Sequence, residues 1–571
     1  MRLLPFILAA LLGLGCQTAP PDYATVSERY EAGRTPDPGR IRQAFFETED
    51  LPARLERLNE LEAQALAVVE DEPLKLGSIG SAILDTYVGS LTGHYVLMRF
   101  YEHVSNPKAD FHREWVERIR ADMESAGDGS RERPYPVVTP AEARMYAISR
   151  GESPVGAIYH GNDPDEGPAF VLLLQVRPER GAVRNVSFDL SPLFLAMRNQ
   201  LTEAARLIPR KSKVPGRSDA PGQDAVEPAP DFNVFTLIGY LAKQNDSAAQ
   251  TSVGAFLYQS DRHGDAVDWL RAASRTGNLI ATTLLATIFV EQAQATDNEA
   301  VREQALDQAM ENYLHAIALG SGDAMYALAM LYLTGQYGED NVASGVPLLE
   351  QASAMGHGDA TVYLAHLHYS GDLVDKDLDA ARQLYVRAAG DGNAFARKSY
   401  ARFLLDREAG QPGDPRAIEW LEELADEQDD PESLLLLGNL HARGVGTRAS
   451  PRRAVRYYEQ AVKKAPTDAN IVNEVAWTLA VSDLRALRRA DYAREIMDHL
   501  MENNREARAR PEYLDTWAAT YAATGDFERA VALQQQAVEA AAAEEYQEVR
   551  EILREHLAAF SAGETVSEAV P

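Results

Sequence analysis

The sequence predicts a mainly α-helical protein, in which an α-α superhelical solenoid of helical hairpins forms the C-terminal part and a smaller α+β domain the N-terminal part. The first observation is a self-similarity that recurs every 36 residues beyond position 248. A fixed period in the thirties indicates stacked helix pairs. The second is three short apolar runs at 155–159, 170–176 and 183–188, which indicate strands. With 571 residues, the chain is also too long for one core, so several domains are expected.

The N-terminus carries a processing signal. Arg2 precedes an apolar run from Leu3 to Leu14, which is too short to span a bilayer as a mature helix. Cys16 follows directly after Gly15 and is the only cysteine of the chain, so it has no partner for an internal disulfide. These residues predict a removable leader over 1–15.

The pattern at 13–16 resembles a bacterial lipoprotein signal. That resemblance implies lipid attachment at Cys16 and, because Gln17 is not an aspartate, sorting to the outer membrane facing the periplasm. The family usually has Leu where Gly13 stands and a small residue where Leu14 stands. An ordinary secretion signal is the alternative.

The domain organisation follows from changes in composition. Residues 16–39 are predicted to be a tether, and 40–208 an α+β domain with helices over 40–125 followed by the strands. Residues 209–231, rich in Pro, Gly and charge, read as a disordered linker because they cannot bury enough apolar surface. The repeats occupy 232–468 and 469–544. A capping helix and tail over 545–571 end the chain.

The repeat columns have physical reasons. Small residues recur where two helices must approach closely, and glycines recur where helices end, because a left-handed cap favours Gly. The columns are Ala316, Ala352 and Ala388; Ala324, Ala360 and Ala396; Gly320, Gly356 and Gly392; and Gly335, Gly371 and Gly444.

These columns resemble the Sel-like repeat, a variant of the tetratricopeptide repeat. The best copy is 437–446 followed by 453–461, and the resemblance covers about 248–466. Residues 469–544 resemble ordinary tetratricopeptide repeats, marked by Trp477 and Trp517. The resemblance implies an adaptor role. Envelope proteins are the implied partners, and a polysaccharide-export assembly is one such implied role.

The candidate partner-binding residues form one column on the first helices of the hairpins, which in such repeats line the concave face. The alternative is that they are ordinary exposed helix positions. The column consists of Thr287, Met330, His366, Arg402 and Asn439.

The sequence shows no motif for catalysis, for a cofactor or for a metal. His94, His103 and His112 lie nine residues apart, whereas metal ligands on a helix are three or four apart, so structural histidines are predicted. The acidic loop 162–166 misses the spacing of a calcium loop. The net charge of 56 − 86 = −30 disfavours nucleic acid as a partner.

The sequence therefore predicts a non-catalytic envelope scaffold, lipid-anchored in the bacterial cell envelope, that binds proteins through its solenoid. Two alternatives stay open. Residues 40–208 could hold an enzyme for which the solenoid is a targeting arm, or the chain could be a secreted protein-binding effector.

Overall fold

The computed structural model describes residues 22–161, 168–179, 181–195, 233–542 and 546–570. Cys16, the acidic loop 162–166 and the predicted linker 209–231 lie outside these ranges. The chain divides into two compact units, which are described separately: unit 1 is 1–331 with 335–339, and unit 2 is 332–334 with 340–571.

Unit 1 begins with helices that start at capping side chains. Asp22, Asp37, Ser90 and Thr139 each accept a hydrogen bond from a backbone N–H of the first helical turn. The apolar stripe from Leu51 to Val69 is buried, as its spacing predicted. The helices are α1 (Tyr23–Glu31), α2 (Pro38–Phe46), α3 (Leu51–Val68), η1 (Pro73–Lys75), α4 (Leu76–Thr86), α5 (Leu91–His103), α6 (Lys108–Ala126) and α7 (Pro140–Ser149).

A four-stranded sheet follows these helices. Its strands are β1 (Tyr135–Pro136), β2 (Ser153–Gly161), β3 (Phe170–Arg177) and β4 (Arg184–Asp189), in the order β1-β4-β3-β2. The three predicted strands are confirmed and pair antiparallel. The parallel strand β1 was not predicted, because two residues are too few for an alternating pattern.

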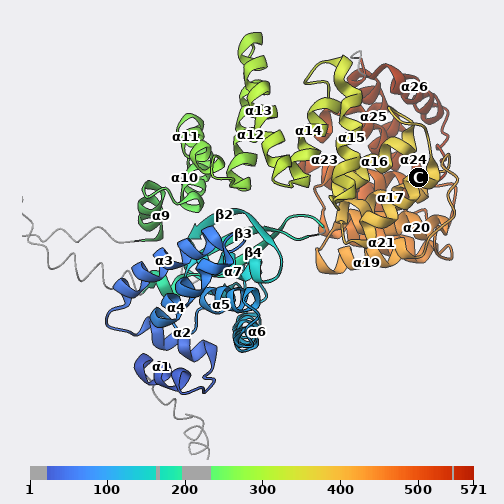
Figure 1. Cartoon of the computed structure of the whole chain (residues 1–571). Helices are drawn as coiled ribbons and strands as arrows, with labels where there is room; N and C mark the ends of the chain where they lie inside the picture. The colour runs from blue at the N-terminus through green and yellow to red at the C-terminus, as the bar shows by residue number, and fades with distance from the viewer. Residues whose placement is uncertain (1–21, 162–167, 180, 196–232, 543–545, 571) are drawn as a thin grey trace, which may run out of the picture. The chain divides into compact units, whose positions relative to one another are not determined.

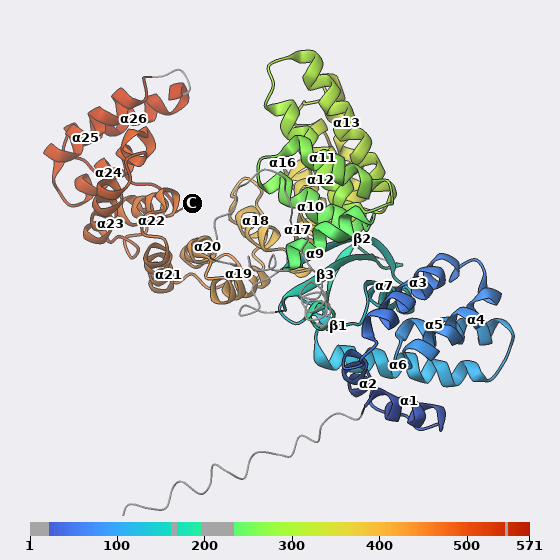
Figure 2. The same cartoon turned by 90° about the vertical axis from the view of Figure 1, so that its left-hand side faces the viewer.

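The first helical hairpins of unit 1 cover the edge strand β2. Asn278 bonds both the N–H and the C=O of Ala157 through its side-chain amide, and the Ser252 hydroxyl bonds both groups of Tyr159. In Figures 1 and 2, these hairpins rise from one side of the sheet and α2–α7 lie on the other. The helices are α9 (Val234–Lys243), α10 (Ser247–Gln259), α11 (His263–Ser274), α12 (Leu279–Gln294), α13 (Glu299–Ala318) and α14 (Gly322–Leu333). The sequence predicted that the linker 209–231 separates the α+β domain from the solenoid. The described residues before and after that linker nevertheless belong to one compact unit.

Unit 2 consists of stacked hairpins and confirms the predicted helical-repeat architecture. The helices are η2 (Glu339–Ser344), α15 (Gly345–Ala354), α16 (Gly358–Ser370), α17 (Leu378–Gly390), α18 (Ala394–Leu405), α19 (Arg416–Glu427), α20 (Pro431–Arg443), α21 (Pro451–Lys464), α22 (Ala469–Val481), α23 (Ala490–Asn503), η3 (Ala507–Ala509), α24 (Pro511–Ala523), α25 (Phe527–Ala540) and α26 (Gln547–Ser561).

The glycine and alanine columns behave as predicted. Gly320, Gly356 and Gly392 follow second helices with φ of 94°, 90° and 90°, in the left-handed region. Ala324, Ala360 and Ala396 are fully buried. The 36-residue period of the sequence therefore corresponds to helix ends at the glycines and to close helix packing at the alanines.

The predicted capping helix is α26, but its apolar residues divide between two environments. Leu553 is buried, whereas Val549 and Ile552 are 42% and 51% exposed. The helix thus covers the last hairpin and still presents an apolar face to solvent.

Candidate functional site

The first helices of the hairpins form the inner surface of unit 2. α16 contacts α18, α18 contacts α20, α20 contacts α22, and α22 contacts α24. Within the described chain, the second helices α17, α19, α21, α23 and α25 make no comparable contacts with one another. The stack therefore curves toward its first helices. We call their solvent-facing surface, from α16 to α26, the inner groove.

The first hollow of the inner groove, the proximal hollow, has a volume of about 310 Å³. Charged side chains surround an apolar floor: Glu432 pairs with Arg402 and, at 2.6 Å, with Lys398. It is lined by Arg402, Leu405, Asp406, Glu432, Leu435, Leu436, Asn439 and Glu474. Such a rim can orient a polar segment over a small apolar contact.

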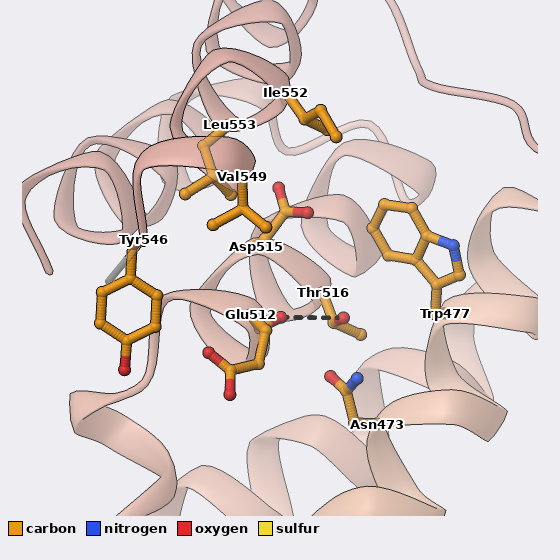
Figure 3. Close-up of a pocket in the computed structure, with 9 residues that line it drawn as sticks. All are labelled: Asn473, Trp477, Glu512, Asp515, Thr516, Tyr546, Val549, Ile552 and Leu553. Carbon is orange, nitrogen blue, oxygen red and sulfur yellow. Dashed lines mark hydrogen bonds between the residues drawn. The ribbon is translucent and has the colours of Figure 1, made fainter. Parts of the chain in front are cut away.

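The second hollow, the distal hollow, has a volume of about 410 Å³ and lies between α22, α24 and α26 (Figure 3). Polar and aromatic side chains of α22 and α24 face the exposed apolar side of α26 across it. The lining residues are Asn473, Trp477, Glu512, Asp515, Thr516, Tyr546, Val549, Ile552 and Leu553. The buried Oδ1 of Asn473 accepts no hydrogen bond from the described residues.

Charges at the distal hollow are arranged by a buried network. Asp515 accepts hydrogen bonds from Gln534 Nε2 at 2.6 Å and from His556 Nδ1 at 2.9 Å. Burial acts to lower the pKa of His556, but the hydrogen bond and charge of Asp515, together with Glu568, outweigh it and raise that pKa above its usual value.

The residues of the predicted partner-binding column lie in different environments. In unit 1, Thr287 and Met330 are half-buried, and the Thr287 hydroxyl donates to the Thr283 carbonyl of its own helix. In unit 2, His366 and Arg402 are exposed. Asn439 is buried at 3% exposure.

Asn439 is tied to its neighbours on both sides. Its Nδ2 donates to Glu474 Oε1 at 2.9 Å, and its Oδ1 accepts from the Tyr458 hydroxyl at 2.7 Å. Arg402 and Asn439 both line the proximal hollow. The predicted column thus supplies two residues of the proximal hollow. The distal hollow was missed, although Trp477 is the ninth residue of α22 as Asn439 is of α20.

A buried polar cluster in unit 1 is the other concentration of titratable groups. Thr139 donates to Glu62, while Glu142 accepts from the backbone N–H groups of Leu91 and Val138. Burial, and then the charge of Glu142, raise the pKa of Glu62 to about 8. Both carboxyl groups are closed off from solvent, which suits a structural role.

His94 and His112 meet in the same region, although 18 residues separate them. Their Nδ1 atoms lie 3.1 Å apart, and His94 Nε2 lies 3.1 Å from the Val88 carbonyl. Since that carbonyl only accepts, His94 donates to it, and His112 Nδ1 donates to His94 Nδ1. Burial lowers the pKa values to about 3 for His94 and about 4 for His112, so both rings are neutral.

The described residues contain neither a candidate metal site nor a candidate membrane-spanning helix. No group of three or more His, Cys, Asp and Glu side chains comes together as ligands for a metal ion within those ranges. Among the described helices, none is long and apolar enough to cross a membrane.

Fold and groove together define a protein built of Sel1-type and tetratricopeptide-type helical hairpins. The Sel1 repeat family model matches residues 322–357, 358–393 and 431–465. The chain is 30% identical over 90 residues to the Sel1-repeat-containing protein YjcO of Escherichia coli K12, and equally to YjcO of Shigella flexneri. The match covers 15% of this chain and 39% of the length of those relatives.

Solved repeat proteins are also similar to the chain. A Sel1 repeat protein from Oxalobacter formigenes is 22% identical, covering 39% of this chain and 89% of that one with a TM-score of 0.32. The protein c5321 of uropathogenic Escherichia coli, which displays an SLR fold, is 12% identical, covering 93% and 97% with a TM-score of 0.40. Yeast Tom70 is 10% identical, covering 95% of both chains with a TM-score of 0.32.

Proposed function

We propose that this chain is a non-catalytic scaffold of the bacterial cell envelope, which holds a segment of a partner protein in the inner groove of unit 2. The observation that carries the proposal is the groove itself: two hollows share α22, through Glu474 in the proximal and Trp477 in the distal hollow. A segment lying across the first helices would contact both.

The chemistry of the groove suits a polypeptide ligand. Arg402 and Glu432 offer charge at one hollow, and Ile552 offers apolar surface at the other. Trp477 offers an aromatic face beside it. Interface energy concentrates in a few such anchors, each worth about 2 kcal/mol or more when truncated.

The envelope location is proposed from the leader and Cys16. Stable membrane anchoring requires more than one acyl chain, as bacterial lipoproteins carry. Wild-type protein should therefore sediment with membranes and incorporate labelled palmitate, and Cys16→Ser should do neither. Wild-type protein that stays in the soluble periplasmic fraction would contradict the anchor and leave the secreted effector.

The groove is tested by crosslinking the full chain in intact cells. We combine His366→Ala, Arg402→Ala and Ile552→Ala, because all three are exposed and should leave the helical content unchanged. Capture of partners should fall by about tenfold or more, the loss of at least one anchor.

The matched control changes three exposed residues on the second helices, Glu419→Ala, Glu459→Ala and Lys463→Ala. This variant should capture partners as the wild type does. Equal capture by the groove variant and the wild type would place the binding site elsewhere and contradict the proposal.

A further inference from the structure

The chain after α26 folds back onto the inner groove. Beyond Gly563, residues 564–570 run to the C-terminal end of α22. There the Glu568 N–H donates to the Val481 carbonyl at 2.9 Å, and the Asp483 N–H donates to the Glu568 carbonyl at 2.8 Å. The tail thus forms a parallel β-bridge with Ser482.

The tail contacts one wall of the distal hollow and a residue next to the proximal hollow. The Glu568 carboxylate accepts a hydrogen bond from the indole Nε1 of Trp477, which lines the distal hollow. At the other end, Val570 is 3% exposed, and its carbonyl accepts from Arg407 Nη2 at 2.9 Å. Arg407 directly follows Asp406, which lines the proximal hollow.

The tail is held in the manner of a peptide ligand. It forms no helix, and Glu564, Thr565, Ser567 and Glu568 are exposed. Its backbone forms one isolated β-bridge, with Ser482, and one apolar side chain, Val570, is buried. Backbone pairing with pockets for alternate side chains is a general mode of peptide recognition.

Charge on the groove side complements this segment. Arg407 donates to the tail at one end, and Arg488 Nη2 donates to Ser567 Oγ at 3.3 Å. The positive charge of these two arginines beside the tail favours an acidic segment over a basic one.

We infer that residues 564–570 are an internal ligand of the inner groove, and that the segment bound from a partner is an extended acidic peptide that replaces them at Trp477, Ser482 and Arg407. This inference rests on the proposed function. The covalent link keeps the tail at an effective concentration in the millimolar range, so an external peptide of equal affinity must compete with it.

The test uses a fluorescein-labelled peptide with the sequence of residues 564–571 and measures its binding by fluorescence polarisation. A chain ending at Gly563 should bind the peptide about tenfold or more tightly than the full chain does. The same peptide with Glu568→Ala should lose most of its affinity. With Glu564→Ala, which removes an exposed carboxylate that has no contact in the groove, it should bind normally.

Full-length variants keep the test independent of whether the shortened chain folds. Glu568→Ala in the full chain should loosen the tail and raise the affinity for the wild-type peptide, whereas Glu564→Ala should not. Equal peptide binding by both variants, or by the full and shortened chains, would overturn the inference. Loss of partner capture in the groove variant together with a peptide that fails to bind would reject the internal ligand alone. A bound peptide with undiminished partner capture would reject the proposed function alone.

Discussion

The hairpins of unit 1 and unit 2 share one repeat but use their first helices differently. In unit 1, α10 and α12 pack on β2, and their side chains Ser252 and Asn278 complete its hydrogen bonds. In unit 2, the first helices contact one another and line the inner groove. Equivalent positions in the repeats therefore need not have the same function. What covers a first helix decides whether it stabilises a neighbour or stays available for binding.

The largest expected effect comes from removing the link between hairpin and strand. Asn278 caps α12 and also bonds both backbone groups of Ala157. Asn278→Ala should destabilise unit 1 by about 3 kcal/mol, because a cap is worth about 1 kcal/mol and an unpaired buried backbone group about 1 kcal/mol or more. Hydrogen exchange of β2 amides measures the change.

The matched variant in unit 2 is Asn393→Ala. Asn393 caps α18 in the same way, but its amide reaches the exposed Asp359 instead of a strand. We expect a loss of about 1 kcal/mol, the value of the cap alone. Equal losses at Asn278 and Asn393 would show that the hydrogen bonds to Ala157 add nothing.

The fold could be predicted from the sequence as far as its signals are local. The 36-residue period gave the hairpins because helix ends need Gly and close helix pairs need Ala, and both recur in the columns. Contact between β2 and the hairpins could not be predicted. It depends on Asn278, which follows Ala157 by 121 residues and reads locally as a helix cap.

The candidate site was predicted in part for a similar reason. Arg402 and Asn439 lie in one column, and the column does reach the proximal hollow. The distal hollow combines Trp477, which continues that column, with Asp515 at another position of α24 and Ile552 of the capping helix outside the repeats. That Asn439 is buried also had no sequence signal, because its burial depends on Tyr458 of the next helix.

A second difference between the units lies in their buried ionisable groups, and it predicts how the stability of unit 1 depends on pH. The Glu62 pKa is about 8 in the fold against 4.5 normally, so its contribution is full below pH 4.5 and is lost as the pH rises to about 8. His94 and His112 have pKa values of about 3 and 4 in the fold against 6.5 normally. Their contribution to the stability of unit 1 is therefore complete above pH 6.5 and is lost as the pH falls below it. Unit 1 should be most stable near pH 6.5.

Glu62→Gln tests the loss of stability that is expected as the pH rises above 6.5. Between pH 6.5 and 8, wild-type unit 1 should lose about 2 kcal/mol more stability than the variant does, at about 1.4 kcal/mol per pH unit. Urea denaturation followed by pulse proteolysis separates fragments of unit 1 from those of unit 2. A parallel decline in variant and wild type would show that Glu62 does not titrate in this window.

The smallest expected effect compares one glycine column in both units. Gly392 in unit 2 and Gly320 in unit 1 have φ of 90° and 94°. A Cβ at Gly392 meets nothing within 4 Å, so Gly392→Ala should cost about 1 kcal/mol from left-handed strain alone. A Cβ at Gly320 would lie 2.7 Å from Cδ of Arg177, a β3 residue that donates to the Leu319 carbonyl.

Gly320→Ala should therefore cost more than Gly392→Ala, because Arg177 must move and its hydrogen bond weakens in addition to the backbone strain. Gly390→Ala is the control: Gly390 ends α17, has open space around it and lacks the positive φ, so alanine there should stabilise the helix by up to about 1 kcal/mol. Chemical denaturation of the three full-length variants measures the order. If Gly320→Ala and Gly392→Ala cost the same, the sheet does not constrain the hairpins of unit 1, and the two units differ only in what their first helices leave exposed.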